Sequence, residues 1–210
     1  MHRKFPKLKI VLEHATTRAA IDTVKSLGDT VGCTITAHHL DLTVDDWAGQ
    51  SFHFCKPVAK YPDDRAALQQ VIREGQYVNR LSDLAQFCSH SFTESGHPRF
   101  FLGSDSAPHP ISSKSTATPT QGCAAGVYTS PVLLPLIAHL LESFGALNNL
   151  QGFVSDNGRR FYGRLAEERF QKTVQLIRAK TKVEEIAQLD GIEVVPFWLG
   201  KELDFRLAPI

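Results

Sequence analysis

A short motif in the middle of the chain combines a carboxylate and an imidazole, two groups that can bind a metal ion or transfer a proton. Asp105 follows an apolar run that ends at Gly103, and His109 comes four residues later, between two prolines. Proline fixes φ and offers no backbone N–H, so this segment must be a loop, which can present both side chains to one cavity. Taken alone, the motif is equally consistent with an aspartate that caps a turn beside a surface histidine.

Histidines also follow two other apolar runs, at His14 and at the His38-His39 pair. Imidazole and carboxylate are ligands that a borderline divalent ion such as zinc prefers. A single histidine at a strand end is more often structural, but three such groups on three strands favour a shared metal site. We therefore expect His14, His39 and Asp105 to be metal ligands.

Two histidines near these runs are expected to lie outside the metal site. Adjacent residues of a strand face opposite sides, so His38 is the weaker member of its pair. His53 alternates with Phe52 and Phe54, and we interpret it as a structural residue of a strand.

Composition excludes several classes of protein. The chain has 210 residues, enough for one well-packed domain, and its formal net charge of +1 offers no basic surface for nucleic acid. No apolar run is long enough to span a bilayer, and no secretory apolar core follows the basic start, so we expect a cytoplasmic protein. The four cysteines are far apart and include no Cys-x-x-Cys pair, which favours reduced thiols.

Apolar strands alternating with helices must position these side chains. Strands are predicted at residues 10–12, 31–36, 52–55 and 99–103, and helices at residues 18–27 and 62–74. Thr16 or Thr17 can cap the first helix, and Gly28 can end it. Because the strands are apolar and not alternating, they are typical of a parallel sheet covered on both faces.

The second half of the chain is predicted to be mainly helical. Helices are expected at residues 131–144, 150–161 and 164–179, and a small terminal hairpin is expected to pair residues 192–198 with residues 203–207.

Residues 77–95 do not fit this pattern, because they lack periodicity at a connection that is usually two to about six residues long. We interpret this insert as an untranslated segment read through in error. The codons permit it: a splice-donor-like string can be written across residues 76–78, and Ser95 can supply the closing AG. A spliced cDNA that contains these codons would rule the idea out.

Four motifs together resemble dihydroorotase, the single-function type of the amidohydrolase superfamily. They are Glu-His-Ala-Thr-Thr at 13–17, Thr-Ile-Thr-Ala-His-His-Leu at 34–40, Gly-Ser-Asp-Ser-Ala-Pro-His at 103–109 with Lys114, and Gly-Cys-Ala-Ala-Gly at 122–126. Residues 161–163 and 195–197 also fit the C-terminal region of that family. The resemblance covers nearly the whole chain except residues 77–95.

The resemblance implies a (β/α)8 TIM barrel, an α/β fold, with two zinc ions that interconverts L-dihydroorotate and N-carbamoyl-L-aspartate in pyrimidine biosynthesis. His14 and His39 would match two ligands of one zinc ion, and Asp105 the carboxylate that binds the other and shuttles a proton. His109 would bind the substrate carboxylate, and the backbone around Lys56 and Ala125 would contact the ring. The complete protein is expected to be a cytoplasmic homodimer with a small-molecule substrate and no nucleic acid or membrane partner.

The chain also departs from the family, whose first strand carries His-x-His and whose fourth strand carries a carboxylated lysine that bridges both metals. Neither is present here, and a full barrel needs about 250 residues. We therefore expect residues 1–210 to be a single amidohydrolase-type domain without the N-terminal half of its barrel. It would hold strands five to eight, C-terminal helices and a small hairpin, and be inactive alone.

Two other functions remain open. The chain could be another cyclic amidohydrolase, similar to hydantoinase or allantoinase, although the Ala-Pro-His motif with Lys114 favours dihydroorotase. It could also be a non-catalytic relative that serves as an interaction partner.

Overall fold

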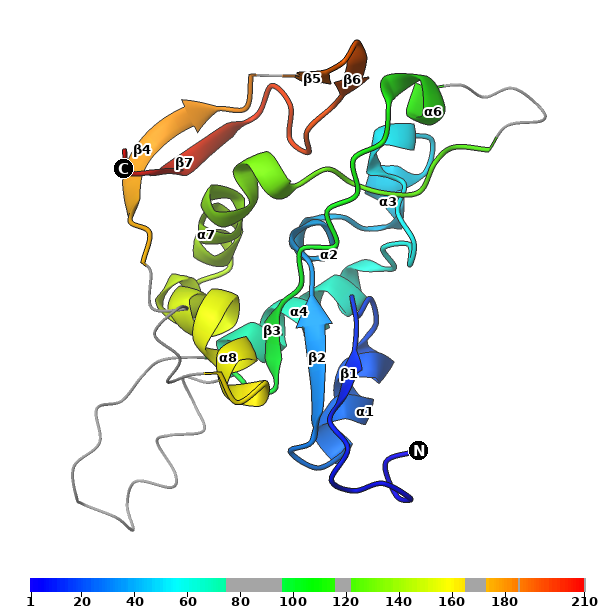
Figure 1. The fold of residues 1–210 in the computed structure, drawn as a ribbon, viewed down its shortest axis with the longest axis vertical. Coiled ribbons are helices and arrows are strands. Elements are labelled where there is room, and N and C mark those ends of the chain that lie inside the picture. Colours follow the sequence, from blue (N-terminus) through cyan, green and yellow to red (C-terminus); the bar gives the residue numbers. More distant parts are fainter. Residues whose placement is uncertain (75–95, 116–121, 165–172, 185, 210) are drawn as a thin grey trace.

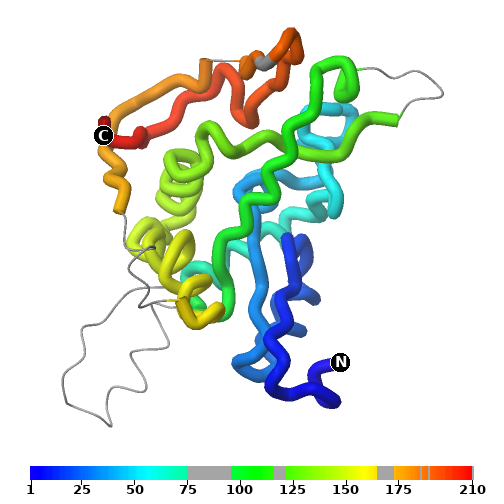
Figure 2. The backbone as a smooth tube through the Cα atoms, viewed as in Figure 1, coloured from blue at the N-terminus to red at the C-terminus, as the bar shows by residue number. Residues whose placement is uncertain are grey.

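The computed structural model describes residues 1–74, 96–115, 122–164, 173–184 and 186–209 (Figure 1). The interpretation of residues 77–95 as an insert therefore falls outside the described residues. The N- and C-termini of the chain lie on opposite sides of the molecule (Figure 2).

The chain opens with a strand–helix–strand unit, as its sequence predicts. Strand β1 (Ile10–Leu12) leads to helix α1 (Arg18–Ser26) and then to strand β2 (Val31–Ile35). The Thr17 hydroxyl accepts a hydrogen bond from the Ala20 backbone N–H at 3.1 Å, which confirms Thr17 as the residue that caps α1.

Three strands form a parallel sheet in the order β1-β2-β3, with β3 at Phe100–Leu102 (Figure 1). Ile10 pairs with Val31, and Cys33 pairs with Phe100. Every residue of the central strand β2 is buried, as expected for a covered parallel sheet. The described strands do not close into a barrel, and β1 and β3 are the two edges of this sheet.

The outer edge of β3 packs against the helical segment formed by a π-helix (Gly152–Asp156) and helix α8 (Asn157–Phe161). The Asn157 side-chain amide donates to the Phe100 carbonyl at 3.2 Å, so this edge carbonyl has a hydrogen-bond partner. The predicted helix at 150–161 is thus helical over most of its length, but as two different helix types.

Arg99, directly before β3, ties the sheet to the end of α1. Its Nη1 donates to the Val24 carbonyl at 2.6 Å and to the Leu27 carbonyl at 2.8 Å, and its Nη2 donates to the Lys25 carbonyl at 3.1 Å. These carbonyls belong to the last turn of α1, where intrahelical partners are missing and the helix dipole favours a cation.

The strand predicted at residues 52–55 is wrong. Residues Ser51–His53 form a 3₁₀ turn instead, and the Phe54 carbonyl accepts hydrogen bonds from distant groups rather than from a neighbouring strand. The connection between β2 and this turn holds two short helices, α2 (Ala37–Asp41) and α3 (Val44–Trp47). Helix α4 (Pro62–Arg73) follows and confirms the predicted helix there.

Helices make up much of the next part of the chain. The described helices there are α6 (Ile111–Ser115), a 3₁₀ turn (Ser130–Val132), α7 (Leu133–Ser143) and a 3₁₀ turn (Leu147–Asn149). Helix α7 confirms the apolar helix predicted at 131–144, and its buried residues join the core that also covers the sheet.

The C-terminal predictions are wrong in two places. Residues predicted as the end of a helix at 164–179 belong to strand β4 (Leu176–Lys182), which pairs with β7 (Glu202–Leu207). The expected hairpin between 192–198 and 203–207 does not form, because β6 (Ile192–Val194) pairs with β5 (Ala187–Leu189). In the described parts of the chain, no helix is long and apolar enough to cross a membrane.

Candidate metal and substrate site

The polar residues that the sequence singles out lie at the carboxyl ends of the three parallel strands. His14 follows β1 by one residue, Asp105 follows β3, and His38 and His39 lie in α2 directly after β2. His14 and Asp105 both have left-handed backbone conformations, with φ of 41° and 40°. Positive φ is uncommon for residues other than glycine, and such strained positions gather at functional sites.

Thr34 of the central strand positions both flanking strand ends. Its hydroxyl accepts a hydrogen bond from the His14 backbone N–H at 2.7 Å and donates to Glu13 at 2.6 Å. On the other side, a Cβ added at Gly103 would lie 2.7 Å from the Thr34 Cβ. Only glycine therefore lets the end of β3 come this close to β2.

Both adjacent histidines point into the interior, which corrects the argument that set His38 aside. Thr36 caps helix α2, so the chain is already helical at Ala37 and the alternation of a strand does not apply. His38 is 0% exposed and His39 is 1% exposed. The signal in the sequence was Thr36, a good N-cap residue two positions before His38.

The two histidines differ in how their ring nitrogens are satisfied. His39 Nδ1 lies 2.7 Å from the Thr36 hydroxyl, and His39 Nε2 lies 2.9 Å from the Pro57 carbonyl. His38 has no hydrogen-bond partner on either ring nitrogen. Its Nε2 lies 3.9 Å from a carboxylate oxygen of Asp105, beyond hydrogen-bond distance.

Burial sets the charge states in this cluster. Desolvation lowers the pKa of His38 well below its ordinary value of 6.5 and lowers the pKa of His39 to about 4. His14 lowers both further through charge repulsion. Desolvation raises the pKa of Asp105, and the positive potential of His14 opposes that rise. Both buried imidazoles are therefore neutral at pH 7, the form that binds metals.

The structure thus brings the predicted ligands His14, His39 and Asp105 to one edge of the sheet, but the direct contact of Asp105 is with His38. Zinc implied by the resemblance fits these donors. At a tetrahedral angle, two ligand atoms about 2.0–2.2 Å from one zinc ion are roughly 3.3–3.6 Å apart, so the 3.9 Å between His38 Nε2 and Asp105 would have to shorten by a few tenths of an ångström for both to bind one ion. The unpartnered, buried nitrogens of His38 also need a partner.

The predicted substrate-binding residues form a second group beside the first. His109 Nε2 lies 2.9 Å from the Ala125 carbonyl, and a Cβ at Gly126 would lie 2.8 Å from the His109 ring. The imidazole therefore rests against residues 122–126. Lys56 is exposed and precedes Pro57, whose carbonyl contacts His39, so it borders the metal cluster.

Lys114 fixes the loop that carries Ala125. Its side chain is buried, and its ammonium donates to the carbonyls of Phe54, Ala124 and Gly126 at 2.9, 3.1 and 2.8 Å. One cation thus joins the 3₁₀ turn at 51–53 to the loop at 122–126, which explains why a lysine follows the Ala-Pro-His motif.

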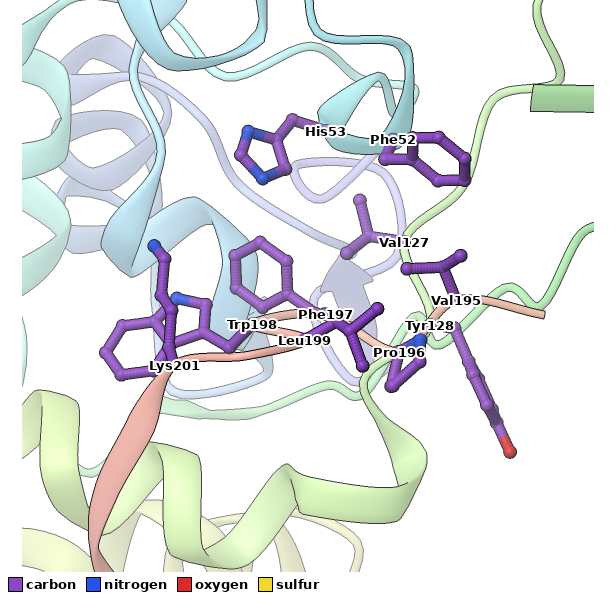
Figure 3. Close-up of a pocket in the computed structure, with 10 residues that line it drawn as sticks. All are labelled: Phe52, His53, Val127, Tyr128, Val195, Pro196, Phe197, Trp198, Leu199 and Lys201. Carbon is purple, nitrogen blue, oxygen red and sulfur yellow. The ribbon is translucent and has the colours of Figure 1, made fainter. Parts of the chain in front are cut away.

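A cavity of about 340 Å³ lies next to this loop, enclosed by aliphatic and aromatic side chains from three segments (Figure 3). Phe197, from the C-terminal segment, packs edge-on against His53 with ring centroids 5.7 Å apart, and Trp198 lies beside Lys201. Phe52, Tyr128 and Val195 also line a smaller recess that contains His109 and Lys114. The C-terminal segment therefore completes the wall beside the predicted substrate residues.

The chain is similar to dihydroorotases along almost its whole length. The chain is 45% identical over 252 residues to the dihydroorotase of Mycosarcoma maydis, across 99% of this chain and 59% of that protein. The chain is similar to the C-terminal portion of dihydroorotases.

The crystal structure of Saccharomyces cerevisiae dihydroorotase in complex with 5-fluoroorotic acid superposes with a TM-score of 0.80 at 36% identity, over 99% of this chain and 53% of that enzyme. The chain therefore spans little more than half the length of a dihydroorotase. No protein-family model matches it.

Hydantoinases share the fold at much lower identity. The L-hydantoinase of Arthrobacter aurescens superposes with a TM-score of 0.67 at 15% identity, over 94% of this chain and 42% of that enzyme. This likeness shows that the two proteins share the described α/β fold and says nothing about substrate.

Proposed function

We propose that this chain is the C-terminal part of a dihydroorotase, which interconverts L-dihydroorotate and N-carbamoyl-L-aspartate when its barrel is complete. Similarity along the whole chain carries the proposal, since 45% identity to a dihydroorotase far exceeds the 15% identity to a hydantoinase of the same fold. The runner-up function, hydrolysis of a hydantoin or of allantoin, has only the shared fold in its favour.

In this proposal, residues 1–210 belong to one amidohydrolase-type domain, and the β1-β2-β3 sheet is an arc from the second half of its (β/α)8 barrel. The outer side of β1, which has no strand partner among the described residues, supports this, because a barrel strand pairs on both sides. In parallel β/α barrels the active site lies at the carboxyl ends of the strands. His14, His39 and Asp105 lie at those ends here. The complete enzyme would be a cytoplasmic homodimer.

Each residue of the site has a role that its surroundings allow. His14, His39 and Asp105 would hold zinc, and zinc would supply polarisation of the ring carbonyl and activation of water. Asp105 would accept a proton and return it to the ring nitrogen, a task helped by a pKa raised by desolvation. His109, held by Ala125, would bind the substrate carboxylate, with the backbone at Lys56 and Ala125 beside the ring.

The test compares the chain alone with the chain completed in trans. Residues 1–210 purified with zinc should neither hydrolyse dihydroorotate nor behave as a clean monomer, because apolar sheet edges invite association. Co-expression with the N-terminal portion of the Mycosarcoma maydis enzyme, which this chain does not match, should restore dihydroorotate hydrolysis but not hydantoin hydrolysis. A stable monomer that turns over dihydroorotate alone would refute the half-barrel interpretation. Preferred hydantoin hydrolysis would refute the substrate assignment, and an inactive but well-formed complex would favour a non-catalytic partner.

A further inference from the structure

Trp198 in the C-terminal segment contacts the short helix that carries the two buried histidines. Its indole Nε1 donates to a carboxylate oxygen of Asp41 at 2.7 Å, and the two residues are 157 positions apart in the chain. Asp41 is the last residue of α2, two positions after His39. This hydrogen bond therefore links the C-terminal segment to the helix that holds a proposed metal ligand.

The backbone conformation of Trp198 is unusual for a large side chain. The Leu199 N–H donates to the Pro196 carbonyl at 3.2 Å, so residues 196–199 form a tight turn. Trp198 is the third residue of this turn and has φ of 65°, a left-handed conformation in which glycine or asparagine is usual. Strain of this kind persists only where surrounding contacts compensate it, and it gathers at functional sites. The turn thus holds an indole where a smaller residue would be accommodated more easily.

Two further contacts fix the direction of the indole. The His139 ring of α7 packs edge-on against it, with ring centroids 5.0 Å apart. The Lys201 ammonium lies 4.7 Å from the indole centroid, and Figure 3 shows the two side chains next to each other. The indole N–H is therefore held in one direction, towards Asp41.

Helix α2 depends on contacts with other elements, because five residues are too few to form a stable helix by themselves. Gln69 and Arg65 of α4 donate to the carbonyls of its last two residues, at 3.0 and 2.6 Å. These bonds hold the backbone from the side of α4, and the bond from Trp198 holds the side chain of Asp41. Together they define the rotation of α2 and so the direction of its histidines.

We propose that Trp198 is a positioning residue for His39, acting through Asp41 and helix α2. The inference rests on the proposed function, in which His39 holds zinc. Ligands of a metal site must be held within about 0.5 Å of their productive positions, and residues that orient a ligand typically change metal affinity 10–100-fold. The C-terminal segment thus strengthens metal binding without supplying a ligand.

Four variants separate the hydrogen bond from the bulk of the two side chains. Trp198→Phe removes the donor but keeps an aromatic ring, and Asp41→Ala removes the acceptor. Asp41→Asn keeps an oxygen that can accept the bond, so it should restore what Asp41→Ala loses. Trp47→Phe is the matched control, because Trp47 is the other tryptophan of the chain and its indole donates to the Ala59 carbonyl at 2.8 Å, outside α2.

Zinc affinity is measured by competition with a chelator, in the complex of this chain with the N-terminal portion of the Mycosarcoma maydis enzyme. Trp198→Phe and Asp41→Ala should each weaken zinc binding 10–100-fold, and the double variant should be no weaker than the weaker single variant. Asp41→Asn and Trp47→Phe should change the affinity by less than about threefold. At saturating zinc, Trp198→Phe should leave the KM for dihydroorotate unchanged. Unaltered zinc affinity in Trp198→Phe and Asp41→Ala, or an equal loss in Trp47→Phe, overturns the proposal.

Hydrogen exchange in residues 1–210 alone gives a second readout that needs neither zinc nor turnover. The Leu42 N–H donates to the His38 carbonyl at 2.8 Å, so its exchange rate reports the opening of α2. Trp198→Phe should raise this rate roughly tenfold and leave the rate of the Leu27 N–H, at the end of α1, unchanged. Equal acceleration at both amides, or no change at Leu42, would overturn the proposal. A complex that binds zinc with the expected pattern of affinities but does not hydrolyse dihydroorotate would refute the proposed function and support this inference; if no complex forms, the exchange rates decide.

Discussion

Replacing Lys114 with methionine should release the loop at 122–126 while preserving most of the packing of the side-chain stem. The lysine ammonium donates to three carbonyls, and it is 4% exposed. Methionine fills a similar volume but donates no hydrogen bond, so all three carbonyls would lose this partner.

The size of the effect follows from those three contacts. A hydrogen bond to a charged group contributes about 1.5–3 kcal/mol, but three bonds that share one ammonium do not add. Burying the ammonium also has a desolvation cost, which methionine avoids. We therefore expect Lys114→Met to lower the free energy of unfolding by about 3–5 kcal/mol.

Two measurements check this prediction, urea unfolding and the alkylation rate of Cys123. The Cys123 thiol lies 3.4 Å from the Ser51 carbonyl across the same junction, so its reactivity reports local opening. A local loss of about 3 kcal/mol would raise the alkylation rate roughly 100-fold. Lys60→Met is the matched control, since among the described residues the Lys60 ammonium donates one hydrogen bond, to the nearby Val58 carbonyl at 2.8 Å. Equal effects from the two variants would refute the role given to Lys114.

Three further predictions concern stability, pH and turnover. Arg99→Ala should lower the free energy of unfolding in urea by about 2–4 kcal/mol by removing the cation at the end of α1, whereas exposed Arg206→Ala should change it by less than about 0.5 kcal/mol. Burial raises the pKa of Cys33 from 9.0 to about 12, so the unfolded chain ionises first and stability falls as pH rises above 9. Between pH 8 and 10 this loss is about 1.4 kcal/mol, and Cys33→Ala should show a shallower decline; parallel declines would contradict it. In the complete enzyme, Asp105→Asn should abolish dihydroorotate hydrolysis without unfolding the protein, and near-normal turnover with metal bound would exclude the proton-transfer role.

Local signals in the sequence were enough to predict the three parallel strands and helices α1 and α4. Thr17 is a strong capping residue, and the apolar runs at Ile10–Leu12 and Phe100–Leu102 have few alternatives to a buried strand. Because the carboxyl ends of parallel strands share one edge, the gathering of His14 and Asp105 was predictable as well.

What could not be predicted depends on distant partners. Residues 52–55 alternate like a strand, yet Phe54 bonds through its carbonyl to Lys114 and to the Gly126 backbone N–H, far along the chain. The sequence of β4 has the mixed charge of a surface helix. Its antiparallel pairing with β7 makes it a strand instead.

The pairing of the parallel sheet also has a consequence for the order of folding. Ile10 pairs with Val31, 21 residues later, whereas Cys33 pairs with Phe100, 67 residues later. Closing the longer loop costs about 1 kcal/mol more in chain entropy, since the cost grows with the logarithm of loop length. We therefore expect β1, α1 and β2 to assemble first and β3 to dock late. Weakening the β2–β3 contact should then mainly accelerate unfolding and leave the folding rate almost unchanged.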